Sequence, residues 1–421
     1  MEIDQLYHKF KECSSFSTDT RRIEEGAMYF ALKGENFNGN RFVNQAFAKG
    51  ALYCVIDEVD AKTNDNCLVV EDVLSTLQHL ATFHRQQLNI PIISLTGSNG
   101  KTTTKELINA VLSTTYKTSA TLGNLNNHIG VPLSLLSIPN DAEIGIVEMG
   151  ANHQKEIEFL SNIAYPDYGL ITNFGKAHLE GFGGIQGVIK GKSELYVHLK
   201  QHQKTIFVNK DDQKQLQQIG NYDKILTFGD NTSFIKADPF VALNFKDKTI
   251  QSQLTGAYNY NNIIAAIAIG QHFNVADNDI IDAIESYIPN NNRSQIIVKN
   301  SNNIILDAYN ANPSSMVVAL DNFGQMKASK KIAFLGDMFE LGETSLEEHQ
   351  NIADYTLQFD IDSIFLIGEN FNATLAKSSK VKLFKTFDDV KEELISTNIE
   401  NSSILIKGSR GMALERLLEF I

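Results

Sequence analysis

Residues 96–105 read TGSNGKTTTK and combine residue types that bind phosphate. They lie between an apolar run, 90–95, and a helix-like run, 106–112. A glycine turn between a strand and a helix N-terminus brings backbone N–H groups and the positive end of the helix dipole together. Lys101 can then reach terminal phosphates, and the Thr102 hydroxyl can ligate Mg²⁺. The alternative is a glycine turn followed by an exposed lysine, which explains the G-K-T-T order less well.

The loop is shorter than the common phosphate loop. The pattern G-x-x-x-x-G-K-[ST] would require glycine at position 95, where Leu95 stands. The strand, turn and helix order still favours a site for nucleotide phosphate. The candidate nucleotide-binding residues of the loop are Gly97, Ser98, Asn99, Gly100, Lys101, Thr102 and Thr103.

Two further polar residues follow apolar segments that we expect to be strands of a parallel sheet. Glu148 closes the run 144–148, and His178 lies a few residues after the run 168–172. Because ligands bind outside the carboxyl ends of parallel strands, both positions suit metal contacts beside Lys101. A solvated strand end is by itself the better explanation of Glu148, and a lone histidine is more often packed or on the surface. Mg²⁺ also prefers oxygen ligands, so a contact from His178 would be unusual.

The elements that position these residues follow a regular pattern. Apolar strand candidates and amphipathic helices alternate along most of the 421 residues, which predicts an α/β fold with mostly parallel sheets. A polar break at 289–292 separates the second block from the third. The predicted domains are 1–84, a small α/β unit; 85–292, a central nucleotide-binding unit of the P-loop type; and 293–421, a third α/β unit.

Composition narrows the class of protein. The net charge is −13, whereas a general nucleic-acid binder usually carries a basic face, so we expect no nucleic-acid partner. Three cysteines without C-x-x-C spacing argue against a disulfide framework and for a reducing compartment. No apolar run approaches the roughly 20 residues that span a bilayer, and the N-terminal segment lacks the apolar region of a signal peptide. We therefore expect a cytoplasmic protein without membrane insertion.

Several separated motifs carry a resemblance to a known family. The loop TGSNGKTT is similar to the ATP loop of the Mur ligases, cytoplasmic enzymes that form amide bonds in peptidoglycan precursors. Other matching segments follow in order over essentially the whole chain: Ser17–Arg21 (STDTR), Gly123–Pro132 (GNLNNHIGVP), Glu148–His153 (EMGANH), His178–Gly183 (HLEGFG), Tyr309–Pro313 (YNANP), Leu335–Gly342 (LGDMFELG) and Lys407–Arg410 (KGSR). These segments look most like those of the family member that adds D-alanyl-D-alanine.

The resemblance implies an ATP-dependent ligase that joins D-alanyl-D-alanine to UDP-N-acetylmuramoyl-tripeptide through an acyl phosphate. It implies an N-terminal domain for the UDP-sugar, a central ATPase domain and a C-terminal Rossmann-like domain. The expected cofactors are ATP, two Mg²⁺ ions and a carbamylated lysine, and the expected partners are the two small-molecule substrates. We expect a monomer that is open without ligands and closes when they bind, because the substrates come from three domains.

The resemblance also implies roles for individual residues. The expected catalytic residues are Lys101, Lys192, Glu148 and His178, and the expected metal contacts are Thr102, Glu148, His178 and Lys192. A carbamate on Lys192 would turn a cation that repels Mg²⁺ into an oxygen ligand. By pattern alone, however, Lys192 and its alternative Lys190 both face solvent. The expected nucleotide contacts outside the loop are Asn259, Asn262, Arg293 and Asp307, and the expected substrate contacts are Thr20, Arg21, Asn126, Asn127, Asn310 and Asn312.

The chain departs from the family pattern at three positions. Tyr258 stands where the family has histidine, and Asn38 and Asn40 replace an aspartate and a histidine in a loop expected to contact the UDP-sugar. The open alternatives are another Mur step, folylpolyglutamate synthetase, a phosphate-loop ATPase or kinase that acts as a switch, and a nucleotide-binding scaffold. No residue can be assigned as the base that deprotonates the attacking amine. His349 is a candidate, but we expect it to be a histidine on the surface of a helix.

Overall fold

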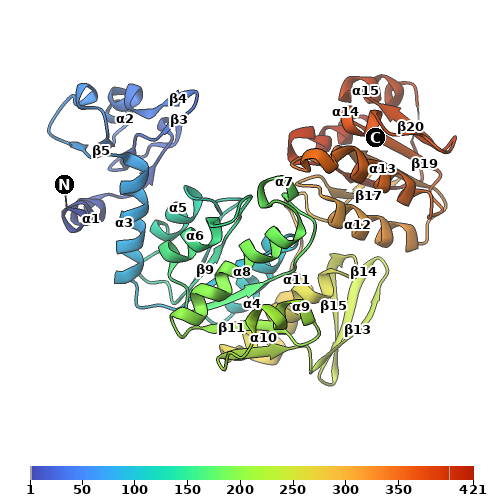
Figure 1. Cartoon of the computed structure of the whole chain (residues 1–421), viewed down its shortest axis with the longest axis horizontal. Coiled ribbons are helices and arrows are strands. Elements are labelled where there is room, and N and C mark those ends of the chain that lie inside the picture. The colour runs from blue at the N-terminus through green and yellow to red at the C-terminus, as the bar shows by residue number, and fades with distance from the viewer. Residues whose placement is uncertain (1, 398) are drawn as a thin grey trace.

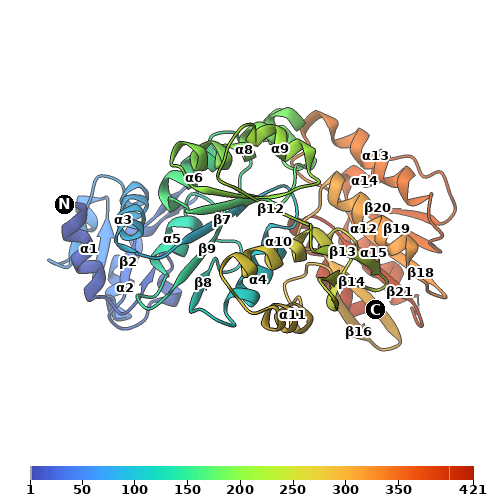
Figure 2. The same ribbon diagram turned by 90° about the horizontal axis from the view of Figure 1, so that it is seen from below.

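The computed structural model describes residues 2–397 and 399–421. The chain forms three α/β bodies, each built on its own main sheet (Figure 1). The central body lies between the other two, which occupy opposite ends of the molecule (Figures 1 and 2). This arrangement confirms the predicted three-domain α/β fold, while the boundaries at 84 and 292 stay predictions.

The amino-terminal body is a four-stranded parallel sheet in the order β1-β2-β5-β6. Its strands are β1 (Phe16–Ser17), β2 (Met28–Phe30), β5 (Tyr53–Ile56) and β6 (Cys67–Val69), and β3 (Lys33–Gly34) pairs with β4 (Phe37–Asn38) in a hairpin. Its helices are α1 (Ile3–Glu12), α2 (Val43–Ala48) and α3 (Val73–Gln87). The Asp72 carboxylate caps α3 by accepting the N–H of Ser75 at 2.6 Å. Because α3 packs against α1 and against helices of the central body, it joins the two bodies.

The central body is a six-stranded parallel sheet in the order β12-β11-β10-β7-β9-β8. Its strands are β7 (Ile92–Thr96), β8 (Thr118–Ala120), β9 (Ile144–Glu148), β10 (Tyr168–Ile171), β11 (Thr205–Asn209) and β12 (Ile225–Phe228). Its helices are α4 (Lys101–Leu112), α5 (Gly130–Leu136), α6 (Glu156–Ala164), α7 (Leu179–Phe182), α8 (Ile185–Gln201), α9 (Gln213–Ile219), α10 (Asn259–His272) and α11 (Asp277–Ser286). Ile92 and its neighbour Ile93 belong to two different core clusters, so β7 is packed on both faces. Burial on both faces explains its continuous apolar sequence.

An antiparallel sheet of three strands, which the sequence pattern did not predict, completes the central body. It consists of β13 (Thr232–Ala237), β14 (Phe240–Phe245) and β15 (Lys248–Thr255). Most of β13 is exposed, whereas Ile250, Ser252 and Leu254 are buried at alternate positions of β15. The edge strand β13 was missed because an exposed edge strand carries no continuous run of buried apolar residues.

The carboxyl-terminal body is a six-stranded sheet in the order β16-β17-β21-β18-β19-β20. Its strands are β16 (Gln295–Lys299), β17 (Asn302–Asp307), β18 (Lys331–Gly336), β19 (Ser363–Ile367), β20 (Val381–Phe384) and β21 (Ser403–Lys407), and its helices are α12 (Pro313–Gln325), α13 (Ser345–Thr356), α14 (Glu369–Asn372) and α15 (Phe387–Ile395). β16 and β17 form an antiparallel hairpin, and the other strand pairs are parallel. No helix within residues 2–397 and 399–421 is long and apolar enough to cross a membrane.

Candidate active site

The phosphate loop connects β7 to α4, as its sequence predicts. Gly97 has φ 152° and Gly100 has φ 79°, a conformation that favours glycine. A Cβ on Gly97 would lie 1.9 Å from Thr172 Oγ1, and one on Gly100 would lie 2.7 Å from Asn262 Oδ1. The two glycines therefore allow the loop to lie directly against β10 and α10.

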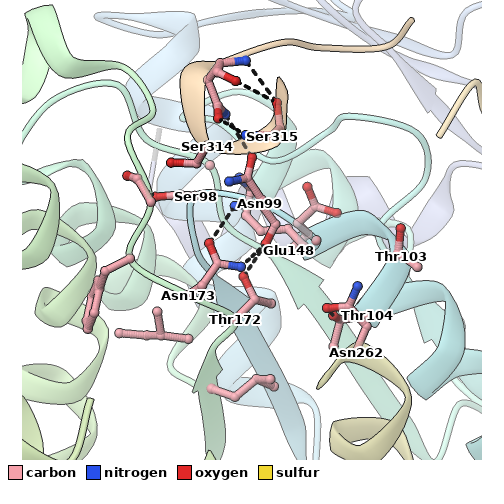
Figure 3. A pocket seen from close by; sticks show the side chains of 18 of the residues that line it. Ser98, Asn99, Thr103, Thr104, Glu148, Thr172, Asn173, Asn262, Ser314 and Ser315 are labelled. Carbon is pink, nitrogen blue, oxygen red and sulfur yellow. Dashed lines mark hydrogen bonds between the residues drawn. The ribbon is translucent and has the colours of Figure 1, made fainter. Parts of the chain in front are cut away.

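Residues at the end of β10 hold the loop in shape (Figure 3). The carbonyl oxygen of Asn99 accepts hydrogen bonds from Thr172 Oγ1 at 2.5 Å and from Asn173 Nδ2 at 2.9 Å. The Ser98 hydroxyl donates to the carbonyl of Gly175 at 2.9 Å. Sequence reasoning did not select Thr172 and Asn173, although their position directly after a predicted parallel strand was a usable signal.

Lys101 begins α4 beside the loop. Its amine donates to the carbonyl of Gly97 at 2.7 Å. Desolvation lowers the pKa of Lys101 to about 8; the nearby Glu148 opposes this shift, and the nearby Arg293 adds to it. A phosphate at this point would stabilise the protonated amine, because it would bring negative charge next to Lys101 and Arg293, two cations that repel each other.

Glu148 lies at the carboxyl end of β9 and is buried. Its Oε1 accepts from Thr102 Oγ1 at 3.2 Å and from Asn126 Nδ2 at 2.7 Å. Its Oε2 is buried without a hydrogen-bond partner in the described chain. A buried carboxylate oxygen needs a partner, and a cation held by this carboxylate and the Thr102 hydroxyl would supply one. These residues therefore fit a metal ion, although the described residues contain no group of three or more His, Cys, Asp and Glu that could hold one.

Lys192 is fully buried on α8, which corrects the expectation that it faces solvent. Its amine has no hydrogen-bond partner among the described residues and lies 5.0 Å from the centre of the Phe182 ring. Burial, reinforced by the charge of Lys101, holds the pKa of Lys192 well below its usual value. Lys190 is exposed, since residues two apart on a helix point to nearly opposite sides. Of the two lysines, Lys192 is therefore the buried one, and its carbamylation stays a prediction.

His178 precedes α7 with φ 53°. Its Nδ1 forms a hydrogen bond with the Glu340 carboxylate of the carboxyl-terminal body. This hydrogen bond is the main cause that lowers the pKa of Glu340. The sequence placed His178 at the loop edge but gave no indication of this partner, which lies 162 residues away.

The carboxyl-terminal body supplies the opposite wall of the site. The Arg293 guanidinium lies 3.9 Å from the centre of the Tyr309 ring, and its Nε is buried without a partner in the described chain. Asp307 accepts from the Ser294 N–H at 3.2 Å and from the Lys407 amine at 2.6 Å. Sequence reasoning gave Lys407 no individual role.

The asparagines predicted as ligand contacts mostly bond to protein groups. Asn127 Oδ1 accepts from the backbone N–H of Gly130 at 2.8 Å, and Asn310 Oδ1 accepts from its neighbour Ala311 at 2.9 Å. Asn262 Nδ2 donates to Asn259 Oδ1 at 2.7 Å. Their roles toward ligands stay predictions.

A cavity of about 1430 Å³ separates the two walls. The predicted residues that line it are Ser98, Asn99, Gly100, Lys101, Thr103, Asn126, Asn127, Glu148, His178, Asn262, Arg293, Asp307, Asn310 and Asn312. The predicted residues that are not part of its lining are Thr20, Arg21, Gly97, Thr102, Lys192 and Asn259. Thr20 and Arg21 lie in the amino-terminal body, where Thr20 bonds to Gln45 and Arg21 pairs with Asp19.

His349 is not the surface histidine that we expected. It is fully buried on α13, where its ring forms a hydrogen bond with the segment that follows β18. Nδ1 donates to the carbonyl of Ser345 at 2.7 Å, and Nε2 accepts from the N–H of Met338 at 2.9 Å. With both ring nitrogens engaged, His349 supports the LGDMFELG segment and is a poor candidate for the base.

Comparison with known proteins identifies the family. Three family models match successive parts of the chain: the Mur ligase family catalytic domain at 13–96, the Mur ligase middle domain at 95–270, and the Mur ligase glutamate ligase domain at 292–410. The UDP-N-acetylmuramoyl-tripeptide–D-alanyl-D-alanine ligase of Bacillus subtilis (strain 168) is 35% identical over 425 residues, covering 96% of this chain and 92% of that protein. The chain belongs to the Mur ligase family.

Solved Mur ligase structures agree with this assignment. A crystal structure of MurF from Acinetobacter baumannii matches with a TM-score of 0.88 at 31% identity, covering 99% of this chain and 97% of that one. The structure of MurF ligase from Thermotoga maritima in complex with ADP matches with a TM-score of 0.84 at 26% identity, covering 96% of each chain. The similarity therefore includes all three bodies of this Mur ligase.

Proposed function

We propose that this Mur ligase joins D-alanyl-D-alanine to UDP-N-acetylmuramoyl-tripeptide in peptidoglycan synthesis and converts ATP to ADP and phosphate. The full-length similarity to the ligase of that name, at 35% identity, carries the proposal. The likeness to an ADP complex supports ATP as the nucleotide. The cavity supports it chemically, because a phosphate loop forms one wall and cationic and amide groups of the carboxyl-terminal body form the other.

The reaction must turn a carboxylate into an acyl donor. A carboxylate oxygen of the tripeptide attacks the γ-phosphorus of ATP, the bond to the β–γ bridging oxygen breaks, and ADP leaves. The neutral amine of D-alanyl-D-alanine then attacks the carbonyl carbon of the acyl phosphate, phosphate leaves, and the amine loses a proton. Phosphoryl transfer needs positioning and charge neutralisation more than covalent help from the protein.

The loop and the opposite wall supply that neutralisation. Lys101 and the N–H groups at the start of α4 would face the phosphates, and Arg293 would approach them from the carboxyl-terminal body. The Nε of Arg293 is buried and has no partner among the residues that the structure describes, and an anionic ligand would satisfy it. The adenine contact from Asn262 and the nucleotide contact from Asp307 are part of the same proposal.

Glu148, Thr102 and His178 would hold Mg²⁺, which would neutralise charge on the phosphoryl group when bound. Lys192 would carry a carbamate as a further oxygen ligand. A neutral amine is the form that reacts with carbon dioxide, and the lowered pKa of Lys192 favours that form. Glu148 Oε2 and Lys192 Nζ support this part of the proposal, since neither atom has a hydrogen-bond partner in the described part of the chain. A cytoplasmic location and a monomeric state stay predictions from the sequence.

One assay tests the function. The protein is incubated with ATP, Mg²⁺, UDP-N-acetylmuramoyl-tripeptide and D-alanyl-D-alanine, and ADP and the UDP-linked pentapeptide are measured by mass spectrometry. We expect both products, and no pentapeptide when D-alanyl-D-alanine is omitted or replaced by L-glutamate. Unchanged ADP formation without the dipeptide would indicate a phosphate-loop ATPase, and a product with glutamate would indicate another ligase of the superfamily.

A further inference from the structure

Lys407 is a buried lysine whose charge the proposed reaction does not use. It ends β21, is 1% exposed, and is among the residues that line the cavity. A lysine is rarely buried to this extent unless its ammonium group is paired. The partners of Lys407 therefore indicate what it does.

The first partner is the carboxylate predicted to contact the nucleotide. β17 and β21 are parallel neighbours, and their last residues, Asp307 and Lys407, are paired in register. The amine donates to Asp307 Oδ2 at 2.6 Å, while Oδ1 accepts from the Ser294 N–H at 3.2 Å. Both carboxylate oxygens are engaged, so the side chain of Asp307 is held in one orientation.

The second partner lies in the segment that follows Asp307. The same amine donates to the backbone carbonyl of Asn310 at 3.2 Å. Two residues later, Asn312 Nδ2 donates to Asn99 Oδ1 of the phosphate loop at 2.8 Å. One ammonium group thus fixes a carboxylate on the cavity wall and the segment that meets the phosphate loop.

We propose that Lys407 is a positioning residue of the nucleotide site, which acts by holding Asp307 and the segment 308–312 in place for ATP. The inference rests on the proposed function, because it takes ATP as the ligand of Asp307. It goes beyond that function in assigning a role to a residue that would not contact ATP itself.

A double-mutant cycle distinguishes positioning from direct contact. The variants are Lys407→Met, Asp307→Asn and the combination of both, each assayed for the KM of ATP, for kcat and for ADP affinity by calorimetry. The combination contains no unpaired buried charge, so it remains informative if Lys407→Met alone does not fold. The matched control is Lys331→Met, which removes a buried lysine from the opposite, amino end of the same sheet, where its amine donates to the Gly324 carbonyl at 2.7 Å.

If Lys407 acts by positioning Asp307, the effects of Lys407→Met and Asp307→Asn on ATP binding should not multiply in the double variant. Lys407→Met should raise the KM of ATP and weaken ADP binding by roughly tenfold to a hundredfold, the usual loss when a supporting partner of a ligand group is removed. When Asp307→Asn is already present, adding Lys407→Met should alter the KM of ATP and the affinity for ADP by less than about twofold. Lys331→Met should lower the thermal midpoint without changing the KM of ATP.

Other results overturn the inference. Effects that multiply in the double variant would mean that Lys407 does not act through Asp307, and an unchanged KM for ATP in Lys407→Met or Asp307→Asn would mean that the pair is only structural. These outcomes require an active wild-type enzyme. A wild-type protein that forms no pentapeptide would instead overturn the proposed function, which separates the two failures.

Discussion

Asn312 and Asn99 are 213 residues apart in the sequence, yet the Asn312 amide donates a hydrogen bond to Asn99 Oδ1 at 2.8 Å. The bond connects the carboxyl-terminal body to the phosphate loop. The Oδ1 of Asn312 also accepts from the N–H of Ser315 at 2.9 Å and so caps α12. One side chain therefore stabilises a helix and joins two bodies, and these two roles can be separated experimentally.

Replacing Asn312 by serine should keep the cap and lose the contact between the bodies. A serine hydroxyl caps a helix almost as well as asparagine does, but it is too short to reach Asn99. We expect an unchanged thermal midpoint and a KM for ATP raised about fivefold, the value of one hydrogen bond. Asn312→Ala should show the same rise in KM together with a loss of about 1 kcal/mol in stability. Equal KM values in the wild type and in Asn312→Ser would contradict a functional role of this bond.

Lys192→Ala should lower kcat by roughly a hundredfold, because a ligand of the proposed metal site would be missing. A short carboxylic acid such as formate or acetate should restore part of the activity by replacing the carbamate. Lys190→Ala is the matched control, because Lys190 is exposed on the same helix and should tolerate the change. If Lys192→Arg, which keeps a positive charge, proves as active as the wild type, the carbamate is excluded.

Residues at strand ends were the predictable part of the site. The register places Glu148 beside Leu95, and Ile171 beside Thr96, so the loops after β7, β9 and β10 share one edge of the sheet. This follows from the parallel arrangement alone, which the alternating strands and helices indicate. Glu148 and His178 were predicted on this basis, whereas Lys101 was predicted from the glycine loop itself.

Burial on helices and contacts between bodies were not predictable. The sequence of α8 does not show which of its sides faces the core, so Lys192 was expected in solvent and is buried. His349 was misplaced for the same reason. Pairs such as Asp307 with Lys407 depend on strand order, since β21 lies between β17 and β18 in the sheet but follows both in the chain. Periodicity reports the type of an element and contains little information about its neighbours.

The buried His198 should make the protein sensitive to mild acid. Burial, helped by the nearby His202 and Lys204, lowers the pKa of His198 to about 4 from its ordinary value of 6.5. Between these values the unfolded chain binds a proton that the folded chain does not, so stability falls as the pH decreases through this window. The slope is about 1.4 kcal/mol per pH unit, and the full loss for this group is roughly 3 kcal/mol.

His198→Gln should therefore lose less thermal stability than the wild type between about pH 7.5 and about pH 5 in scanning calorimetry. Part of the acid sensitivity should remain, because burial also lowers the pKa values of His84 and His349. His8→Gln, a change at an exposed position, serves as the control and should follow the wild type. Parallel curves for His198→Gln and the wild type would show that this histidine is not responsible.

The contact between Lys176 and Glu348 should favour the compact arrangement of the central and carboxyl-terminal bodies. The Lys176 amine donates to Glu348 Oε1 at 2.6 Å, and its backbone N–H donates to Ser314 Oγ at 2.7 Å. We expect small-angle scattering to show a smaller radius of gyration when an ATP analogue and the UDP-sugar peptide are added. Glu348→Gln should require up to about fivefold more ligand for the same compaction, since a partly exposed ion pair contributes at most about 1 kcal/mol. Glu347→Gln changes an exposed neighbour on α13 and should behave like the wild type. If the radius of gyration does not change with ligand in any of these proteins, the two bodies do not close. The cations on the two walls would then meet the nucleotide without any movement.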